Sequence, residues 1–314
     1  MMPSIQKPII IVGTGRCGST LLHRLLALHR DVAWTSTFNE VFPTQTWLSV
    51  FSRLYRVKWL GHRIRHLPCF PKPFEAYRFW ERFLPGFSRR DRPLTADDVP
   101  DDGIEQIRSV VAHLLRSPRR RFLAKVTGWS RIAYFHRIFP DARFVIIHRE
   151  PRAVISSWIQ AGWLDVTSAL DSDSWQWGPV PAHYRQAWQD LGGGPILSAA
   201  VKIQLDRDDI RRNMRLFPDS CYKLDYDDLI ANPIEQLRSL VQFCELPWLS
   251  RFEYSIRAVE FRDTRNKWRK HFTEEQGELI LEFFRRIKAR EPDAAMCAAL
   301  MRGHTTVRQI MVPS

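Results

Sequence analysis

The residues with the clearest chemical meaning form a glycine-rich turn near the start of the chain. It reads Gly13-Thr14-Gly15-Arg16-Cys17-Gly18-Ser19-Thr20 and lies between a β-branched run and a stretch with helical spacing. Glycines let backbone N–H groups close around a phosphate, and the N-terminus of the following helix favours negative charge. The turn therefore predicts an anion-binding site; tight packing of a strand against a helix is the alternative explanation.

Two known patterns overlap in this turn. Gly13, Gly15 and Gly18 satisfy G-x-G-x-x-G, and Glu40 follows near the distance at which a dinucleotide fold places its ribose-binding acid. This first pattern favours a Rossmann-type NAD(P)-dependent oxidoreductase. On its own it is a weak indication.

The second pattern is a P-loop with one change. Ser19 stands where the P-loop lysine is expected, and the positive charge lies instead at Arg16. Without that lysine, an ATPase or kinase loses its main cation at the transferred phosphate. The strand predicted over 143–148 also ends in His-Arg rather than in a metal-binding Asp. A donor shorter than a triphosphate, bound without metal, fits this turn better.

A second phosphate site is predicted further along the chain. The run Phe144 to Trp158 reads as a strand ending at Arg149, a Pro151 suited to the first helical turn, and Ser157 eight residues after the arginine. A guanidinium and a hydroxyl at a strand-to-helix junction suit one more phosphate. A Rossmann fold does not require a second phosphate site of this kind.

With these segments the chain resembles the sulfotransferases that use 3′-phosphoadenosine 5′-phosphosulfate (PAPS). The stretch 13–22 is similar to their 5′-phosphosulfate loop, and 222–233 is similar to their segment with an adenine-contacting tyrosine. The run 267–273 is similar to their Trp-x-x-His-Phe-Thr motif. The nucleotide-binding residues that this resemblance implies are Gly15, Arg16, Cys17, Gly18, Ser19, Thr20, Leu21, Arg149, Ser157, Tyr226, Arg262, Arg265, Lys267 and Trp268.

The resemblance covers roughly 8–42 and 122–273, and it implies a fold and a reaction. The fold is α/β, a P-loop-NTPase-like three-layer arrangement with a mostly parallel central sheet and a helical insertion at about 43–118, in a single domain over 1–314. The reaction moves a sulfuryl group from PAPS to a hydroxyl and releases 3′-phosphoadenosine 5′-phosphate (PAP), with no metal. The acceptor, a glycan, lipid or aryl alcohol, is not identified by the sequence.

The catalytic residues depart from one branch of this family. Lys125 fits the lysine of the cytosolic branch, but Gly128 stands where that branch has its histidine base. We expect Glu40 to act as the base, because it follows the second strand beside the glycine turn, and similar family members use a glutamate there. Arg16 and Lys125 complete the predicted catalytic set.

Hydrophobic patterns predict the elements that must position these residues. Strands are expected over 8–12, 31–34, 122–126, 143–148 and 220–224, and helices over 19–29, 47–60, 102–115, 134–139, 197–216, 233–244 and 274–290. The helix 47–60 is amphipathic and lies in a region rich in Trp and Arg. We expect this insertion to form the acceptor side, with peripheral membrane contact as a further possibility.

Composition limits the remaining alternatives. The 314 residues carry a formal net charge of +13, which favours anionic partners without choosing among them. The basic residues are spread along the chain, which disfavours a nucleic-acid-binding module, although a non-catalytic nucleotide- or nucleic-acid-binding protein is the other alternative. Five scattered cysteines and no long apolar run favour a cytoplasmic protein without a transmembrane segment.

Overall fold

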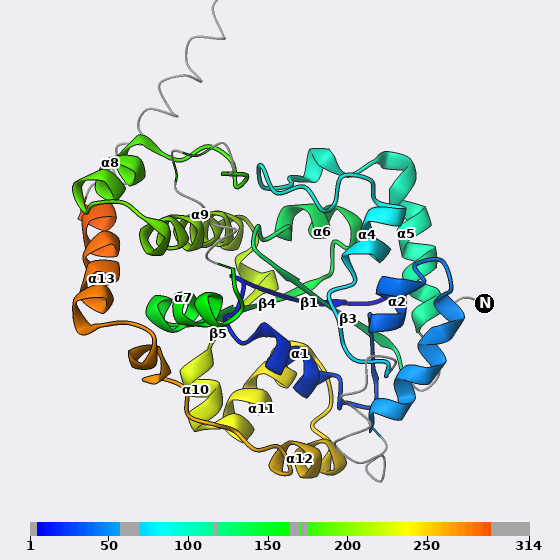
Figure 1. Cartoon of the computed structure of the whole chain (residues 1–314). Coiled ribbons are helices and arrows are strands. Elements are labelled where there is room, and N and C mark those ends of the chain that lie inside the picture. The colour runs from blue at the N-terminus through cyan, green and yellow to red at the C-terminus, as the bar shows by residue number, and fades with distance from the viewer. Residues whose placement is uncertain are drawn as a thin grey trace, which may run out of the picture.

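The computed structural model describes residues 5–56, 70–115, 119–163, 170, 172 and 175–289. At its centre a sheet of order β2-β3-β1-β4-β5 has every neighbouring pair parallel (Figure 1). The prediction of a mostly parallel α/β sheet is confirmed. The strands are β1 (Ile9–Gly13), β2 (Val32–Trp34), β3 (Arg121–Thr127), β4 (Arg143–His148) and β5 (Cys221–Asp225).

Side chains of the central strand alternate between two core layers. Ile9 and Ile11 of β1 belong to one layer, Ile10 and Val12 to the other, and all four are fully buried. Helices cover both faces of the sheet, which gives the predicted three layers. The first layer includes α1 (Ser19–Leu26), α7 (Pro151–Gln160), α9 (Pro195–Leu216) and α11 (Pro233–Phe243), and the second α4 (Tyr77–Phe83), α5 (Asp101–Leu114) and α6 (Ile132–Ile138).

The strand order brings the carboxyl ends of β1, β3 and β4 together. β1 pairs with β3 on one side and with β4 on the other, so the order of the strands changes direction at β1. Ligands of open parallel sheets bind at such a switch point. Because β3 rather than β2 adjoins β1, the order also differs from that of a Rossmann fold.

The remaining elements connect or flank these layers. Helix boundaries differ from the predicted ones by a few residues; α1, for example, ends at Leu26. These further elements are α2 (Thr37–Val41), η1 (Thr46–Arg56), η2 (Ala96–Asp98), α8 (Ala182–Asp190), η3 (Pro218–Ser220), α10 (Tyr226–Ala231), α12 (Ser250–Arg257), η4 (Lys267–Lys270) and α13 (Glu274–Ala289).

The amphipathic segment of the insertion differs in type from the predicted α-helix. Its described part, η1, is a 3₁₀ helix, and 57–60 lie outside the described residues. The buried Arg119 donates to the carbonyl of Ser49 at 3.1 Å and to Oγ of Ser52. The Ser52 hydroxyl donates to the same carbonyl, so the side chains of Arg119 and Ser52 both bind this oxygen.

One buried residue of α1 makes the fold sensitive to acid. His23 is fully buried, and neither of its ring nitrogens has a hydrogen-bond partner in the described structure. Burial, with Lys125 and Arg24 nearby, holds the pKa of His23 well below its ordinary value of 6.5. The unfolded chain therefore takes up this proton at a higher pH than the folded chain does.

We expect the stability of the protein to be highest above pH 6.5 and to fall as the pH drops from there towards the folded pKa. The slope for one proton is at most about 1.4 kcal/mol per pH unit. His23→Leu should flatten this slope in denaturant titrations between pH 7.5 and pH 5. The exposed His113→Gln serves as control and should leave it unchanged; equal slopes in His23→Leu and wild type would contradict the assignment.

Candidate functional site

The glycine turn leads from β1 into α1 with two residues in the left-handed region, Arg16 (φ 67°) and Gly18 (φ 97°). A Cβ on Gly18 would lie 2.2 Å from the ring of Tyr226, so the close approach as well as the backbone requires glycine. The N-terminus of α1 has no side-chain cap. Its first N–H groups therefore remain for an anion.

The second predicted phosphate site lies against this turn. Arg16 Nε donates to Ser157 Oγ at 3.0 Å, and an Arg149 N–H donates to the carbonyl of Arg16 at 3.3 Å. The Arg149 guanidinium lies over the Tyr226 ring, 4.4 Å from its centroid, and donates to Thr264 Oγ1 at 2.9 Å. The two segments that sequence patterns singled out, about 130 residues apart, thus meet at one place.

A side chain of helix α9, in the first core layer, holds the backbone at Arg149 in place. Arg207 of α9 donates to the carbonyl of Arg149 at 3.0 Å and lies 2.9 Å from Nε2 of His148. Burial and the Arg207 charge lower the pKa of His148, although its Nδ1 lies 3.2 Å from Asp225. His148 is therefore uncharged at neutral pH, and it adds no positive charge beside the arginines of the predicted phosphate site.

Arg16, Arg149 and Ser157 line a cavity of about 690 Å³, which we name the donor cavity. Its wall contains several cations and hydroxyls on loops and helix N-termini, a combination suited to phosphate and sulfate groups. The lining residues are Gly15, Arg16, Gly18, Ser19, Thr20, Arg24, Thr37, Lys72, Pro73, Phe74, Glu75, Lys125, Thr127, Arg149, Ser157 and Trp163.

Lys125 lies on β3, at the middle of the donor cavity wall. Its side chain is only 8% exposed, and Nζ donates to Thr20 Oγ1 at 2.9 Å and lies 2.8 Å from Glu75 Oε1. The Thr127 hydroxyl donates to the same glutamate oxygen at 3.0 Å. The lysine is therefore held between the glycine turn and the insertion.

Several residues implied by the resemblance do not line this cavity. Cys17 is fully buried, and burial raises the pKa of its thiol. Arg262 pairs with Glu260, and Arg265 pairs with Asp263, each on the exposed surface. Leu21, Tyr226, Lys267 and Trp268 also lie outside the lining, although Tyr226 contacts the turn and Arg149 as described.

Glu40 lies on α2 and is not part of the cavity wall. One oxygen accepts the N–H of Arg78 at 3.0 Å, and the other lies 3.6 Å from Arg78 Nε. In this arrangement Glu40 binds the N-terminal turn of α4. Its role as the base remains a prediction, and it requires that the carboxylate leave Arg78.

Glu75 is the residue that the sequence did not indicate. It lies in the segment 70–76, where Thr37 N donates to the Lys72 carbonyl at 3.0 Å and Phe74 N donates to the Thr35 carbonyl at 2.9 Å. These bonds bring the insertion against the end of β2. No periodic pattern in this proline-containing segment marks the glutamate in advance.

Comparison with known proteins agrees with this geometry. A model described as the sulfotransferase family matches residues 8–250. The chain belongs to the sulfotransferase family. A curated protein of Aquifex aeolicus (strain VF5), described as uncharacterized, is 39% identical over a stretch that covers 18% of this chain and only 9% of that protein.

Solved sulfotransferases are similar to this chain at low sequence identity, and STF9 shares its fold. The sulfotransferase STF9 from Mycobacterium avium is 15% identical, with 89% of this chain and 76% of that chain covered at a TM-score of 0.52. The sulfotransferase domain of the Synechococcus PCC 7002 olefin synthase is 16% identical, with 90% and 97% covered at a TM-score of 0.48. At such identities the likeness concerns the fold.

Proposed function

We propose that this sulfotransferase moves a sulfuryl group from PAPS to the hydroxyl of an acceptor and that the donor cavity holds PAPS. One observation carries the proposal: the glycine turn and the Arg149–Ser157 pair line the same cavity and are joined by the Arg16–Ser157 hydrogen bond. PAPS carries anionic groups on both sides of its ribose, so it requires two anion sites in one cavity. A mononucleotide with a single phosphate chain requires only one.

The residues divide between the two ends of this donor. At the 5′ end, the N–H groups from Gly18 to Leu21 and the hydroxyls of Ser19 and Thr20 bind the phosphosulfate. At the 3′ end, Arg149 and Ser157 bind the phosphate. The Arg149–Thr264 hydrogen bond connects this end to the segment 262–268. We expect Arg262, Arg265, Lys267 and Trp268 of this segment to complete the 3′-phosphate site when the donor binds.

The transfer is an in-line displacement at sulfur. The acceptor oxygen forms a bond to sulfur while the bond from sulfur to the bridging phosphate oxygen breaks, and PAP leaves with that electron pair. Arg16 and Lys125 stabilise the negative charge that develops on the bridging oxygen and on PAP. A carboxylate removes the hydroxyl proton of the acceptor, so the products are a sulfate ester and PAP.

Two glutamates compete for the role of base. The resemblance places it at Glu40, whereas the geometry favours Glu75, which lines both the donor cavity and a second cavity beside it. A base must reach both the acceptor hydroxyl and the region where sulfur is transferred. Glu75 lines both cavities, whereas Glu40 lines neither.

We expect Glu75→Gln to lower kcat by about a hundredfold or more, because the amide cannot accept the proton of the acceptor hydroxyl. Glu40→Gln should retain most activity. PAP affinity measured on each variant controls for loss of the donor site. The reverse result, with Glu40→Gln inactive and Glu75→Gln active, would assign the base to Glu40.

The donor proposal is tested by calorimetric titration with PAP. Wild type should bind PAP in the micromolar range, and Arg149→Ala should weaken binding about tenfold or more, because a charge-assisted contact to phosphate is lost. The exposed Arg215→Ala is the matched control. Tighter binding of NADH than of PAP would favour the oxidoreductase alternative. Tighter binding of ATP with Mg²⁺ would indicate a phosphate-transfer enzyme. Steeply salt-dependent DNA binding without turnover would favour the nucleic-acid alternative.

An exposed apolar patch supports the further proposal of peripheral membrane contact. It comprises large side chains of α2, η1 and the segment before α4, each 40% to 60% exposed: Val41, Phe42, Trp47, Phe51, Leu54 and Phe74. Phe74 also lines the donor cavity, so the patch reaches the edge of the site. Arg56, a basic residue at the end of η1, donates to the carbonyls of Arg30 and Val32. Residues 57–69, which continue this Arg-rich region, lie outside the described residues. Among the described residues, no helix is long and apolar enough to span a bilayer.

We expect the protein to sediment with vesicles of phosphatidylcholine and phosphatidylglycerol and the double substitution Phe51→Ser, Leu54→Ser to reduce this binding several-fold. Leu216→Ser, at an exposed leucine of α9 outside the patch, is the control and should have no effect. Absence of wild-type binding to these vesicles would refute the membrane contact and leave the donor site untouched.

A further inference from the structure

A second cavity, of about 520 Å³, adjoins the donor cavity, and we name it the acceptor cavity. The two cavities share Gly15, Glu75, Thr127 and Trp163 in their lining. An acceptor hydroxyl at this shared wall would lie beside the end of the donor that carries the sulfuryl group. The side chains that line the acceptor cavity therefore indicate which class of acceptor can bind there.

Aromatic rings form much of this cavity. Besides Trp163, its lining contains Tyr77, Trp129, Trp158 and Trp177. The ammonium of Lys202 contacts two of the indoles, with Nζ 4.8 Å from the ring centroid of Trp129 and 4.9 Å from that of Trp177. Lys202 is 2% exposed and paired with the buried Asp206. This buried pair fixes the two rings, so the cavity offers rigid flat surfaces.

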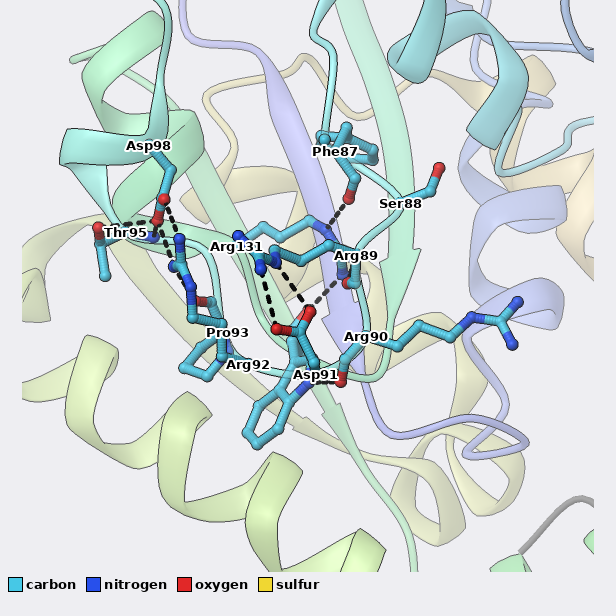
Figure 2. A network of polar contacts seen from close by, with 12 residues as sticks. Phe87, Ser88, Arg89, Arg90, Asp91, Arg92, Pro93, Thr95, Asp98 and Arg131 are labelled. Atoms are coloured by element: carbon cyan, nitrogen blue, oxygen red, sulfur yellow. Dashed lines mark hydrogen bonds and ion pairs between the residues drawn. The ribbon is translucent and has the colours of Figure 1, made fainter. Parts of the chain in front are cut away.

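The loop that precedes η2 closes one side of the acceptor cavity, and polar contacts hold it in place (Figure 2). The Glu81 carboxylate accepts the N–H groups of Gly86 at 2.8 Å and Ser88 at 2.7 Å. The buried Arg131 donates to the carbonyls of Phe87 at 3.1 Å and Arg89 at 3.3 Å. The loop is therefore a fixed part of the wall.

Within this loop, Arg90 differs from its neighbours. Arg89 pairs with Asp91, and Arg92 pairs with Asp98. Figure 2 shows the Arg90 side chain extending away from both pairs. Its backbone carbonyl accepts the Trp129 indole N–H at 2.7 Å, and its guanidinium lies 5.7 Å from the Trp177 ring centroid, with no carboxylate partner in the described part of the chain.

The other lining groups argue against a polyol. A sugar would bury several hydroxyls, and each one left without a partner costs about 1–3 kcal/mol. The described lining contains no Asn or Gln, and its two carboxylates, Glu75 and Asp206, are paired with Lys125 and Lys202. Two of the lining hydroxyls are already engaged, since Tyr77 donates to the Thr127 carbonyl and Thr127 donates to Glu75, each at 3.0 Å. The flat rings and the Arg90 cation are therefore the main features that can select an acceptor.

We infer that the acceptor is a hydroxyaryl acid, an aromatic alcohol that also carries an anionic group. Its ring packs against the tryptophans, its anionic group pairs with Arg90, and its hydroxyl lies at the wall shared with the donor cavity. This inference rests on the proposed function, because the shared wall matters only if PAPS occupies the donor cavity. The cation–anion contact selects acids over neutral phenols of equal shape.

The test compares 6-hydroxy-2-naphthoate with the neutral 2-naphthol. Binding of each is measured by calorimetry with the protein saturated with PAP, and sulfuryl transfer is measured with PAPS. Wild type should prefer the naphthoate about tenfold or more, since a charge-assisted pair contributes at least that ratio. Arg90→Gln should reduce the preference to about twofold or less, and Arg90→Lys should restore part of it. Arg108→Gln, at an exposed arginine of α5, is the control.

The outcomes separate this inference from the function on which it rests. If PAP does not bind wild type, the donor proposal fails. If PAP binds and the naphthoate is neither bound nor sulfated, or if Arg90→Gln keeps the full preference, the acceptor class alone is wrong. Tighter binding of methyl β-D-glucoside than of either naphthalene compound would also overturn it in favour of a glycan.

Discussion

The ion pair between Lys125 and Glu75 joins the parts of this molecule that must act together. Lys125 belongs to β3, Glu75 to the insertion, and Thr20, the other partner of the lysine, to α1. Removing one member of such a little-exposed pair leaves a charge without compensation, which costs about 3–5 kcal/mol for a fully buried pair. The lysine and the glutamate therefore fix each other, and with them the wall between the donor and acceptor cavities.

Two of the anion-binding parts of the donor side follow strand ends, whereas the cation that distinguishes the acceptor side lies on a loop. Arg149 follows β4 and the glycine turn follows β1, so parallel pairing brings them to one edge of the sheet whatever the sequence of the connecting segments. Arg90 and Trp177, by contrast, lie on loops between the regular elements. A family that keeps the first set and varies the second can retain one donor while changing its acceptor.

This division also explains what the sequence could predict. The strand runs, the glycine turn and the Arg149–Ser157 spacing follow local rules, so the sheet and about half of the donor-cavity lining could be inferred. Glu75 could not, because its position depends on backbone bonds between 35–37 and 72–74 rather than on any local pattern. The contacts of η1 with Arg119, a residue far along the chain, are likewise not revealed by any periodicity.

The central position of β1 bears on how the chain acquires its structure. The first strand made has as its two neighbours strands that begin only at Arg121 and Arg143. During synthesis the apolar run Ile9–Val12 therefore remains without its lateral partners until nearly half of the chain exists. Such distant pairing carries a large loop-closure entropy and slows folding. The same strand order that creates the nucleotide site therefore has a cost during synthesis. The apolar strand β1 waits longest for its neighbours in the sheet and stays exposed until they are made.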